Sequence, residues 1–215
     1  MRIFLVTHQC CIDDFLLFIP QRKTSAALAL LFVSCLLTGC STIATGSAEV
    51  TGLSLLHDRR TSGVILSDES TEISASIKLN SNENIRNKCH FNVTSYNGIV
   101  LVSGEAPTEQ LRDKIISIVR VIPDVKLIHN ELQIAQPSSF STRSNDTLIT
   151  TKVKSSISKV SNIPGFDATR VKIITESGTV YLLGLVHKNE GHIATEMART
   201  VDGVKQVVKM FEYID

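Results

Sequence analysis

An internal repeat constrains the fold of this chain more than any other feature of its sequence. When the chain is shifted against itself by about 80 residues, Phe91–Gly104 aligns with Val171–Gly184. The two copies share two glycine positions: Gly98 and Gly104 in the first, and Gly178 and Gly184 in the second. Such a duplication predicts two structural units of the same fold.

Each copy of the repeat reads as a β-hairpin. Alternating apolar residues lead to Asn97-Gly98 in the first copy and to Ser177-Gly178 in the second, pairs that supply the positive φ of a tight turn. A second apolar strand follows each turn. We expect Gly104 and its counterpart to end that strand, where the chain turns toward a helix.

The segments that flank the hairpins also repeat. Apolar residues at helical spacing predict one helix before each hairpin and another after it. These helices cover residues near Asp68–Leu79, Thr108–Arg120, Asn145–Lys159 and Asn189–Thr200, and closing strands follow at Lys126–Ile134 and Lys205–Ile214. The unit is therefore α-β-β-α-β, used twice, which places the chain in the α+β class.

The amino-terminal region reads as a secretory signal covering residues 1–39. Arg22 and Lys23 form its basic part, and Ala26–Leu37 is an apolar stretch too short to span a bilayer as a helix. Residues 1–19 contain two adjacent acidic residues, which are unusual in such a region, so we expect the true start to lie further along the chain.

The end of this signal resembles the lipobox of bacterial lipoproteins. The run Leu37-Thr38-Gly39-Cys40 implies cleavage before Cys40 and acylation by palmitate-type chains, which would anchor the protein on a membrane. Ser41 follows, and by the sorting logic of that family the absence of aspartate favours the periplasmic face of the outer membrane.

Residues 40–67 are predicted to form the lipidated tether, and residues 136–144 a short serine-rich linker. Within the tether, the cluster His57-Asp58-Arg59-Arg60 is interpreted as a solvated charge run, with contact to lipid headgroups as the alternative. After cleavage and acylation Cys89 is the free thiol left, so no disulfide framework is expected, and Cys89 is interpreted as a small buried apolar residue.

The repeated unit resembles the BON domain, a small α-β-β-α-β module with glycines at these hairpin positions and a closing G-V-x-x-V segment. Gly203-Val204-Lys205-Gln206-Val207 matches that segment, whereas the first copy has Asp124 in place of the glycine. Asn145–Lys154 resembles the start of the second domain in periplasmic dual-BON lipoproteins. The resemblance divides the chain into domains at residues 68–135 and 145–215.

The resemblance implies that each domain is a three-stranded mixed sheet packed against two helices. It also implies a non-catalytic role without a cofactor: binding of anionic phospholipid of the phosphatidylglycerol or cardiolipin type, in support of envelope integrity. Envelope proteins are further candidate partners.

The charge distribution favours the second domain for lipid contact. Residues 141–215 hold 10 basic and 8 acidic residues, against 9 and 11 in residues 41–140. Ile149, Val153 and Ile157 recur every fourth residue and should face the sheet. A separate stripe on the same helix is the candidate phospholipid-binding site and consists of Leu148, Lys152, Ser155 and Lys159.

Two interpretations of this stripe stay open. It could insert a leucine among anionic headgroups, or it could be an ordinary solvated helix face with Leu148 packed on the linker. In related lipoproteins a large aromatic residue matches Leu148, so the leucine here predicts weaker lipid contact. The first helix of the first domain carries negative charge, which disfavours contact with anionic lipid. We expect this helix to be a scaffold or a partner surface. Its acidic residues are Asp68, Glu69 and Glu72, with Glu83 nearby.

Other function classes find little support in the sequence. It lacks the H-x-x-x-H, C-x-x-C, G-x-S-x-G and phosphate-loop patterns. His187 and His192 lie near each other without an evident third ligand, so no metal site is expected. Near-zero net charge disfavours nucleic acid as a partner. The remaining hypotheses are a phospholipid-binding lipoprotein and a protein-interaction lipoprotein of the envelope.

Overall fold

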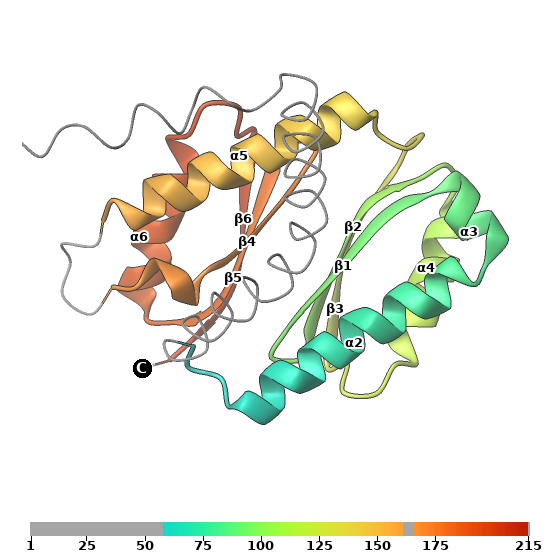
Figure 1. Ribbon diagram of the computed structural model, residues 1–215, viewed down its shortest axis with the longest axis horizontal. Coiled ribbons are helices and arrows are strands. Elements are labelled where there is room, and N and C mark those ends of the chain that lie inside the picture. The colour runs from blue at the N-terminus through green and yellow to red at the C-terminus, as the bar shows by residue number, and fades with distance from the viewer. Residues whose placement is uncertain (1–57, 161–165, 215) are drawn as a thin grey trace, which may run out of the picture. The chain divides into compact units, whose positions relative to one another are not determined.

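The computed structural model describes residues 58–160 and 166–214. The first repeat consists of α2 (Ser62–Asn80), α3 (Glu83–Lys88), β1 (His90–Tyr96), β2 (Ile99–Ala106), α4 (Glu109–Arg120) and β3 (Leu127–Ile134). The second consists of α5 (Phe140–Ser158), a 3-10 turn η1 (Ala168–Arg170), β4 (Lys172–Glu176), β5 (Thr179–Val186), α6 (Lys188–Arg199) and β6 (Gln206–Tyr213). The predicted α-β-β-α-β order is confirmed in both, with the short α3 added before β1 and the turn η1 added before β4 (Figure 1).

Each repeat forms its own three-stranded sheet. The strand orders are β1-β2-β3 and β4-β5-β6, with an antiparallel hairpin followed by a parallel pair. The parallel strand is reached through a helix, α4 or α6, as a parallel connection requires. The mixed sheet implied by the BON resemblance is therefore present twice.

The central strands are apolar over nearly their whole length because both of their faces are covered. In β2, Val100 and Val102 face the helices of the first domain, whereas Leu101 between them faces the other way. In β5, Val180 and Leu182 likewise pack on helices while Leu183 faces away. A strand buried on both sides reads as a continuous apolar run.

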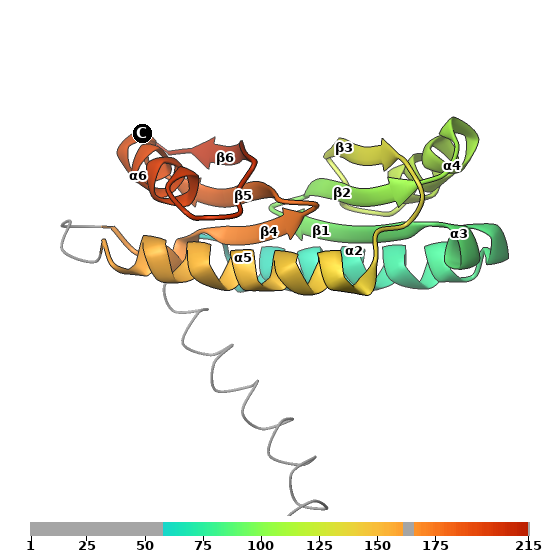
Figure 2. The same ribbon diagram turned by 90° about the horizontal axis from the view of Figure 1, so that it is seen from above.

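The faces that point away from the helices meet each other in what we name the interdomain cluster. Its buried members are Tyr96, Leu101, Tyr181, Leu183 and Met210. Ser54–Asp215 accordingly forms one compact unit. The two domains thus pack through their sheets, and Figure 2 shows α2 and α5 in a common layer on one side of those sheets.

Two helices begin earlier than the sequence predicts. Residues 62–67 belong to α2 instead of the tether, and residues 140–144 belong to α5 instead of the linker. The side chains of Thr61 and Ser139 cap these helices by accepting hydrogen bonds from the N–H groups of Val64 and Thr142. Their serine- and threonine-rich sequence therefore marks helix starts as well as linkers.

Gly104 lies inside its strand, contrary to the expectation that it ends it. β2 continues to Ala106, and β5 likewise runs past Gly184 to Val186. Gly104 has φ +121°, and a Cβ there would lie 2.3 Å from the carbonyl oxygen of His90 on the neighbouring strand. The glycine is needed for close backbone approach.

No helix within the described ranges is both long and apolar enough to cross a membrane. The signal, Cys40 and most of the predicted tether lie outside the described residues. Cys89 is half-buried against the core of the first domain, where burial raises the pKa of its thiol. This position suits the structural role expected from the sequence.

Candidate functional site

The stripe predicted on α5 lies on the surface of the second domain. The opposite side of this helix packs into the core, with Ile149 2% exposed and Val153 and Ile157 fully buried. Leu148 is 60% exposed, and Lys152, Ser155 and Lys159 are exposed as well. Lys159 is the residue that ends the helix. We call these four residues the lysine stripe.

Leu148 is 60% exposed, and residues 140–144, part of the predicted linker, precede it in the same helix. This exposure fits both interpretations of the stripe. Neither Lys152 nor Lys159 forms an ion pair with any residue that the structure describes. The stripe therefore presents one apolar side chain and two ammonium groups that have no ion-pair partner among the described residues.

Phe140 adds an exposed aromatic residue that sequence reasoning missed. It is the first residue of α5 and is 80% exposed. Phe140 and Leu148 are separated by eight residues, or about 12 Å along a helix. An apolar residue directly after the capping Ser139 was the available signal, but the surrounding serines favoured a linker there.

The helix α5 is fixed to its sheet by a buried carboxylate. Asp146 is 5% exposed, and it accepts hydrogen bonds from the N–H groups of Ser177 (2.9 Å) and Gly178 (2.8 Å) in the β4–β5 turn. Ser177 and Gly178 both have positive φ, at 51° and 83°, as in a type I′ turn. This clamp sets the orientation of the helix face that carries the lysine stripe.

The first domain has a corresponding clamp, and Asp68 of its acidic helix forms it. Asp68 on α2 is 4% exposed and accepts hydrogen bonds from Asn97 N–H (2.7 Å), Gly98 N–H (2.8 Å) and Ser95 Oγ (2.6 Å). Burial raises the pKa of the Asp68 carboxyl, but these hydrogen bonds outweigh it and hold the pKa below its usual value.

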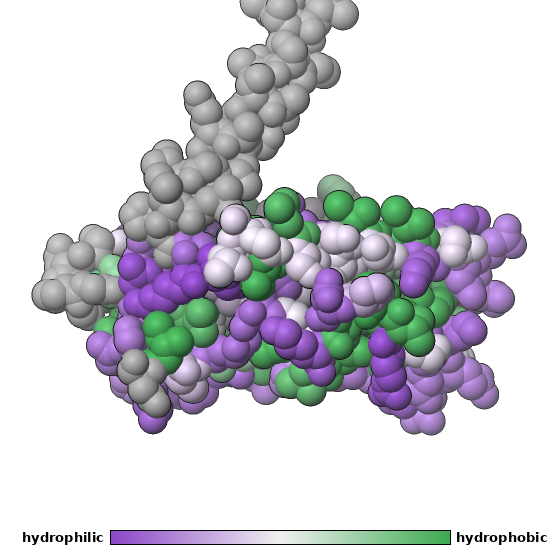
Figure 3. Space-filling view, turned by 90° about the horizontal axis from the view of Figure 1, so that it is seen from below, coloured by the Kyte–Doolittle hydropathy of each residue, from purple (hydrophilic) through white to green (hydrophobic). Residues whose placement is uncertain are grey.

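Glu72 also turns inward instead of forming an acidic surface. Its Oε1 accepts hydrogen bonds from Ser95 N–H at 2.8 Å and from Lys172 Nζ of the second domain at 2.7 Å. Glu69 and Glu83 remain exposed. The outward side of α2 is instead marked by apolar residues that are 60–65% exposed: Leu66, Ile73 and Ile77. Figure 3 shows apolar side chains gathered along the edge where α2 runs.

Arg59 and Arg60 are partnered, so the interpretation of this cluster as a solvated charge run is wrong. The guanidinium of Arg60 lies 2.6 Å from Asp68 and 2.6 Å from Asp58, and 3.7 Å from the ring centroid of Tyr96. Arg59 donates to Glu190 of the second domain at 2.6 Å and to the carbonyl of Leu185. The chain before α2 is thus bound to both domains, while His57 lies outside the described residues.

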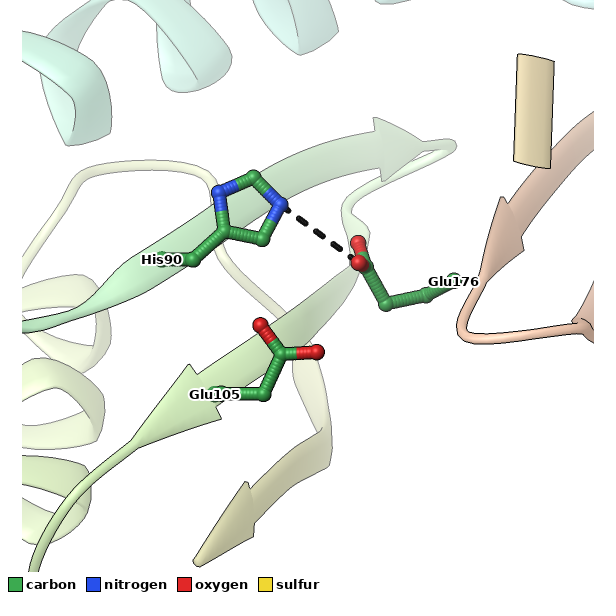
Figure 4. Close-up of side chains that lie close together, drawn as sticks. All are labelled: His90, Glu105 and Glu176. Atoms are coloured by element: carbon green, nitrogen blue, oxygen red, sulfur yellow. Dashed lines mark ion pairs between the residues drawn. The ribbon is translucent and has the colours of Figure 1, made fainter. Parts of the chain in front are cut away.

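A second group of polar residues lies where the two domains meet. His90 at the start of β1, Glu105 in β2 and Glu176 at the end of β4 form what we name the histidine–glutamate cluster (Figure 4). One ligand atom from each lies within 4.8 Å of the other two. A hydrogen bond to Glu176 raises the pKa of His90, and burial opposes this effect.

The structure does not bring His187 and His192 together as ligands. His187 Nδ1 lies 2.8 Å from the carbonyl oxygen of Ile214. The backbone N–H of His187 donates to the Glu190 carboxylate, so His187 stabilises the start of α6. His192 is exposed on that helix. Among the described residues, the only group that places three histidine, cysteine or acidic ligand atoms together is the histidine–glutamate cluster.

Comparison with known proteins identifies both repeats. The family model described as "BON domain" matches residues 70–136 and 145–215. The chain is 32% identical over 196 residues to the "Outer membrane lipoprotein DolP" of Haemophilus influenzae, covering 91% of this chain and 98% of that protein. It is also 32% identical over 157 residues to the "21 kDa hemolysin" of Actinobacillus pleuropneumoniae, covering 73% of this chain and 79% of that one.

Solved structures give a weaker likeness. The C-terminal domain of CdsD, described as a structural protein of the type III secretion system of Chlamydia trachomatis, aligns with 69% of this chain and 67% of its own at a TM-score of 0.27 and 14% identity.

Proposed function

The chain belongs to the BON-domain family of envelope lipoproteins, and on this premise we propose that its second domain docks on anionic phospholipid while Cys40 anchors it by acyl chains. The anchor would hold it on the periplasmic face of the outer membrane. Its role there is to support envelope integrity without catalysis. The similarity to an outer membrane lipoprotein over nearly the whole chain supports this location.

The observation that carries the proposal is the exposure of Leu148 beside lysines that have no ion-pair partner among the described residues. A leucine that is 60% exposed gains free energy when its side chain leaves water. On the same helix face, the ammonium groups of Lys152 and Lys159 can lie near phosphates while the leucine enters the acyl boundary. Phe140 adds an aromatic ring near that boundary and compensates for the leucine at position 148.

The anchor and the stripe would act together. Seventeen residues lie between Cys40 and Asp58, and such a segment spans about 60 Å at most when fully extended. Because Arg59 and Arg60 bind the two domains, the free length of the tether ends at this point. A tether of this length raises the local concentration of the stripe at the membrane, so that a weak docking surface suffices.

Vesicle co-sedimentation of residues 41–215 tests the proposal without the acyl anchor. We expect binding to vesicles that contain phosphatidylglycerol, none to pure phosphatidylcholine, and weaker binding as salt increases. Leu148→Glu should abolish sedimentation, and Lys152→Glu should reduce it. The matched controls are Val121→Glu, at an apolar residue 71% exposed on the first domain, and Lys114→Glu on α4; both should bind like the wild type.

The exposed apolar residues of α2 favour a second candidate function. Leu66, Ile73 and Ile77 follow the spacing of one helix face, which suits docking against an amphipathic helix of an envelope protein. The single lysine of this helix, Lys78, follows Ile77 in its last turn. If no anionic vesicle binds the fragment, and if Ile73→Glu abolishes association with an envelope protein, the chain is a protein-interaction lipoprotein.

A further inference from the structure

The histidine–glutamate cluster joins side chains from both domains on the faces of the sheets that pack against each other. His90 and Glu105 are register partners on β1 and β2 of the first domain. Glu176 belongs to β4 of the second domain. All three point toward one another across the junction in Figure 4. The cluster exists only because the two domains pack together.

The spacing of these side chains matches a metal coordination sphere. His90 Nε2 lies 3.4 Å from Glu176 Oε1. Ligands at about 2.1 Å from a tetrahedral zinc ion are separated from each other by about 3.4 Å. The Glu105 oxygen lies within 4.8 Å of both other ligand atoms, so a small side-chain rotation brings it to the same ion.

The cluster places two carboxylates together in a buried setting. Glu105 and Glu176 are 4% and 8% exposed, and buried carboxylates are paired with a cation or coordinate a metal. In this structure His90 lies 3.4 Å from Glu176, and Arg143 lies 3.4 Å from His90. Glu105 receives hydrogen bonds from two neutral donors, Ser138 N–H at 3.1 Å and Ser177 Oγ at 3.0 Å. A divalent ion would neutralise both carboxylates at once.

The residues around the histidine–glutamate cluster orient its ligands and leave a path for an ion from solvent. Glu105 has two hydrogen-bond partners, Ser138 and Ser177, and outer partners of this kind orient metal ligands. A surface cleft of about 290 Å³ is lined by His90, Glu176 and Thr150, among others, and gives an ion a path from solvent. Arg143 Nη1 lies 3.4 Å from His90 Nδ1. Its side chain belongs to an exposed residue, so it can turn into solvent when Nδ1 keeps the proton and Nε2 binds metal.

We propose that His90, Glu105 and Glu176 bind one divalent transition-metal ion, with zinc preferred and water as the fourth ligand, and that this ion ties the two domains together. A mixed nitrogen and oxygen donor set of this size suits four-coordinate zinc. Magnesium and calcium prefer six or more oxygen ligands. The proposed site is separate from the lysine stripe, so it stands or falls independently of lipid binding.

Isothermal titration of metal-free residues 54–215, which form one compact unit, with zinc chloride tests the site. We expect one zinc ion per chain, a higher unfolding temperature with zinc, and no such shift with magnesium. His90→Asn and Glu176→Gln should weaken zinc binding more than about 100-fold, because outer partners alone account for about 10- to 100-fold. Ser177→Ala should weaken it about 10-fold.

His192→Asn is the matched control, because it removes an exposed histidine from α6 outside the cluster. Its zinc affinity should equal that of the wild type. Titration with cobalt provides a second readout, since a four-coordinate cobalt site absorbs visible light much more strongly than a six-coordinate one. The proposal is overturned by absence of stoichiometric zinc binding, by equal loss in His192→Asn and His90→Asn, or by a six-coordinate cobalt spectrum.

Discussion

The guanidinium of Arg59 lies 2.6 Å from the carboxylate of Glu190, 131 positions further along the chain. Glu190 is 4% exposed and also receives Arg170 at 3.1 Å. Together with Arg60, which binds Asp68, this contact attaches the segment before α2 to both domains.

Removal of this contact should destabilise the folded chain measurably. Arg59→Ala leaves a buried carboxylate with fewer donors, and we expect a loss of about 1–3 kcal/mol in the free energy of unfolding. Urea denaturation followed by circular dichroism measures it. Arg199→Ala is the control, because Arg199 and its partner Glu196 are 64% and 46% exposed, and such a pair contributes at most about 1 kcal/mol. Equal losses in the two variants would contradict the role of Arg59.

The turn clamps should be sensitive to loss of their carboxylates. Asp146→Ala leaves the N–H groups of Ser177 and Gly178 without their acceptor in a buried turn. We expect a loss of about 2–4 kcal/mol, because hydrogen bonds to charged groups contribute about 1.5–3 kcal/mol each and are not additive. Asp113→Ala, at a side chain of α4 that is 67% exposed, should change the stability by less than about 0.5 kcal/mol. Urea denaturation of both variants measures the two changes in the free energy of unfolding.

The free energy of unfolding should decrease as the pH is lowered into the acidic range. Burial raises the pKa values of Asp58, Asp68 and Glu190, but hydrogen bonds and nearby arginines outweigh it, so all three pKa values lie below their usual range. The free energy that these carboxylates contribute to folding is therefore fully present above their unfolded-state pKa values of about 4. This contribution is lost as the pH falls through their lower folded-state pKa values.

Unfolding at a series of pH values from about 6 to 2 would show this loss. In Asp68→Asn the decline of the unfolding free energy should be shallower than in the wild type, because one of the shifted carboxyls is absent. A decline of identical steepness in Asp68→Asn would show that Asp68 has no depressed pKa.

Gly104 should tolerate no side chain. Gly104→Ala forces a Cβ to 2.3 Å from the His90 carbonyl oxygen at a positive φ. The expected destabilisation exceeds about 3 kcal/mol. Gly63→Ala, in the first turn of α2, meets nothing within 4 Å and should leave stability unchanged or raise it by about 0.5 kcal/mol. Thermal unfolding of the two variants compares them, and a mild effect of Gly104→Ala would contradict the close strand approach.

Much of the fold was accessible from the sequence because local rules fix it. The hairpin turns at Asn97-Gly98 and Ser177-Gly178 need positive φ, and few residues adopt it readily. Helical spacing placed Ile149, Val153 and Ile157 on the buried side of α5. The exposure of the lysine stripe followed from the same periodicity.

The errors concern charged and polar residues whose partners lie far away in the sequence. Arg59 finds Glu190, and Glu72 finds Lys172 of the other domain. Composition marks such residues as solvated, since charged side chains usually are. Asp68 likewise finds its partners in a turn 30 positions away, and Asp146 makes the corresponding contact in the second repeat.

By itself the sequence determined the lipobox-like run before Cys40, the duplicated α-β-β-α-β unit and the buried side of each amphipathic helix, because these depend on short-range geometry and residue spacing. Only the tertiary structure decided that the two sheets pack face to face and that His90, Glu105 and Glu176 meet between them. Residues on the outer face of a sheet have the same period whether they meet water or another domain, so a sequence without distance information does not distinguish the two.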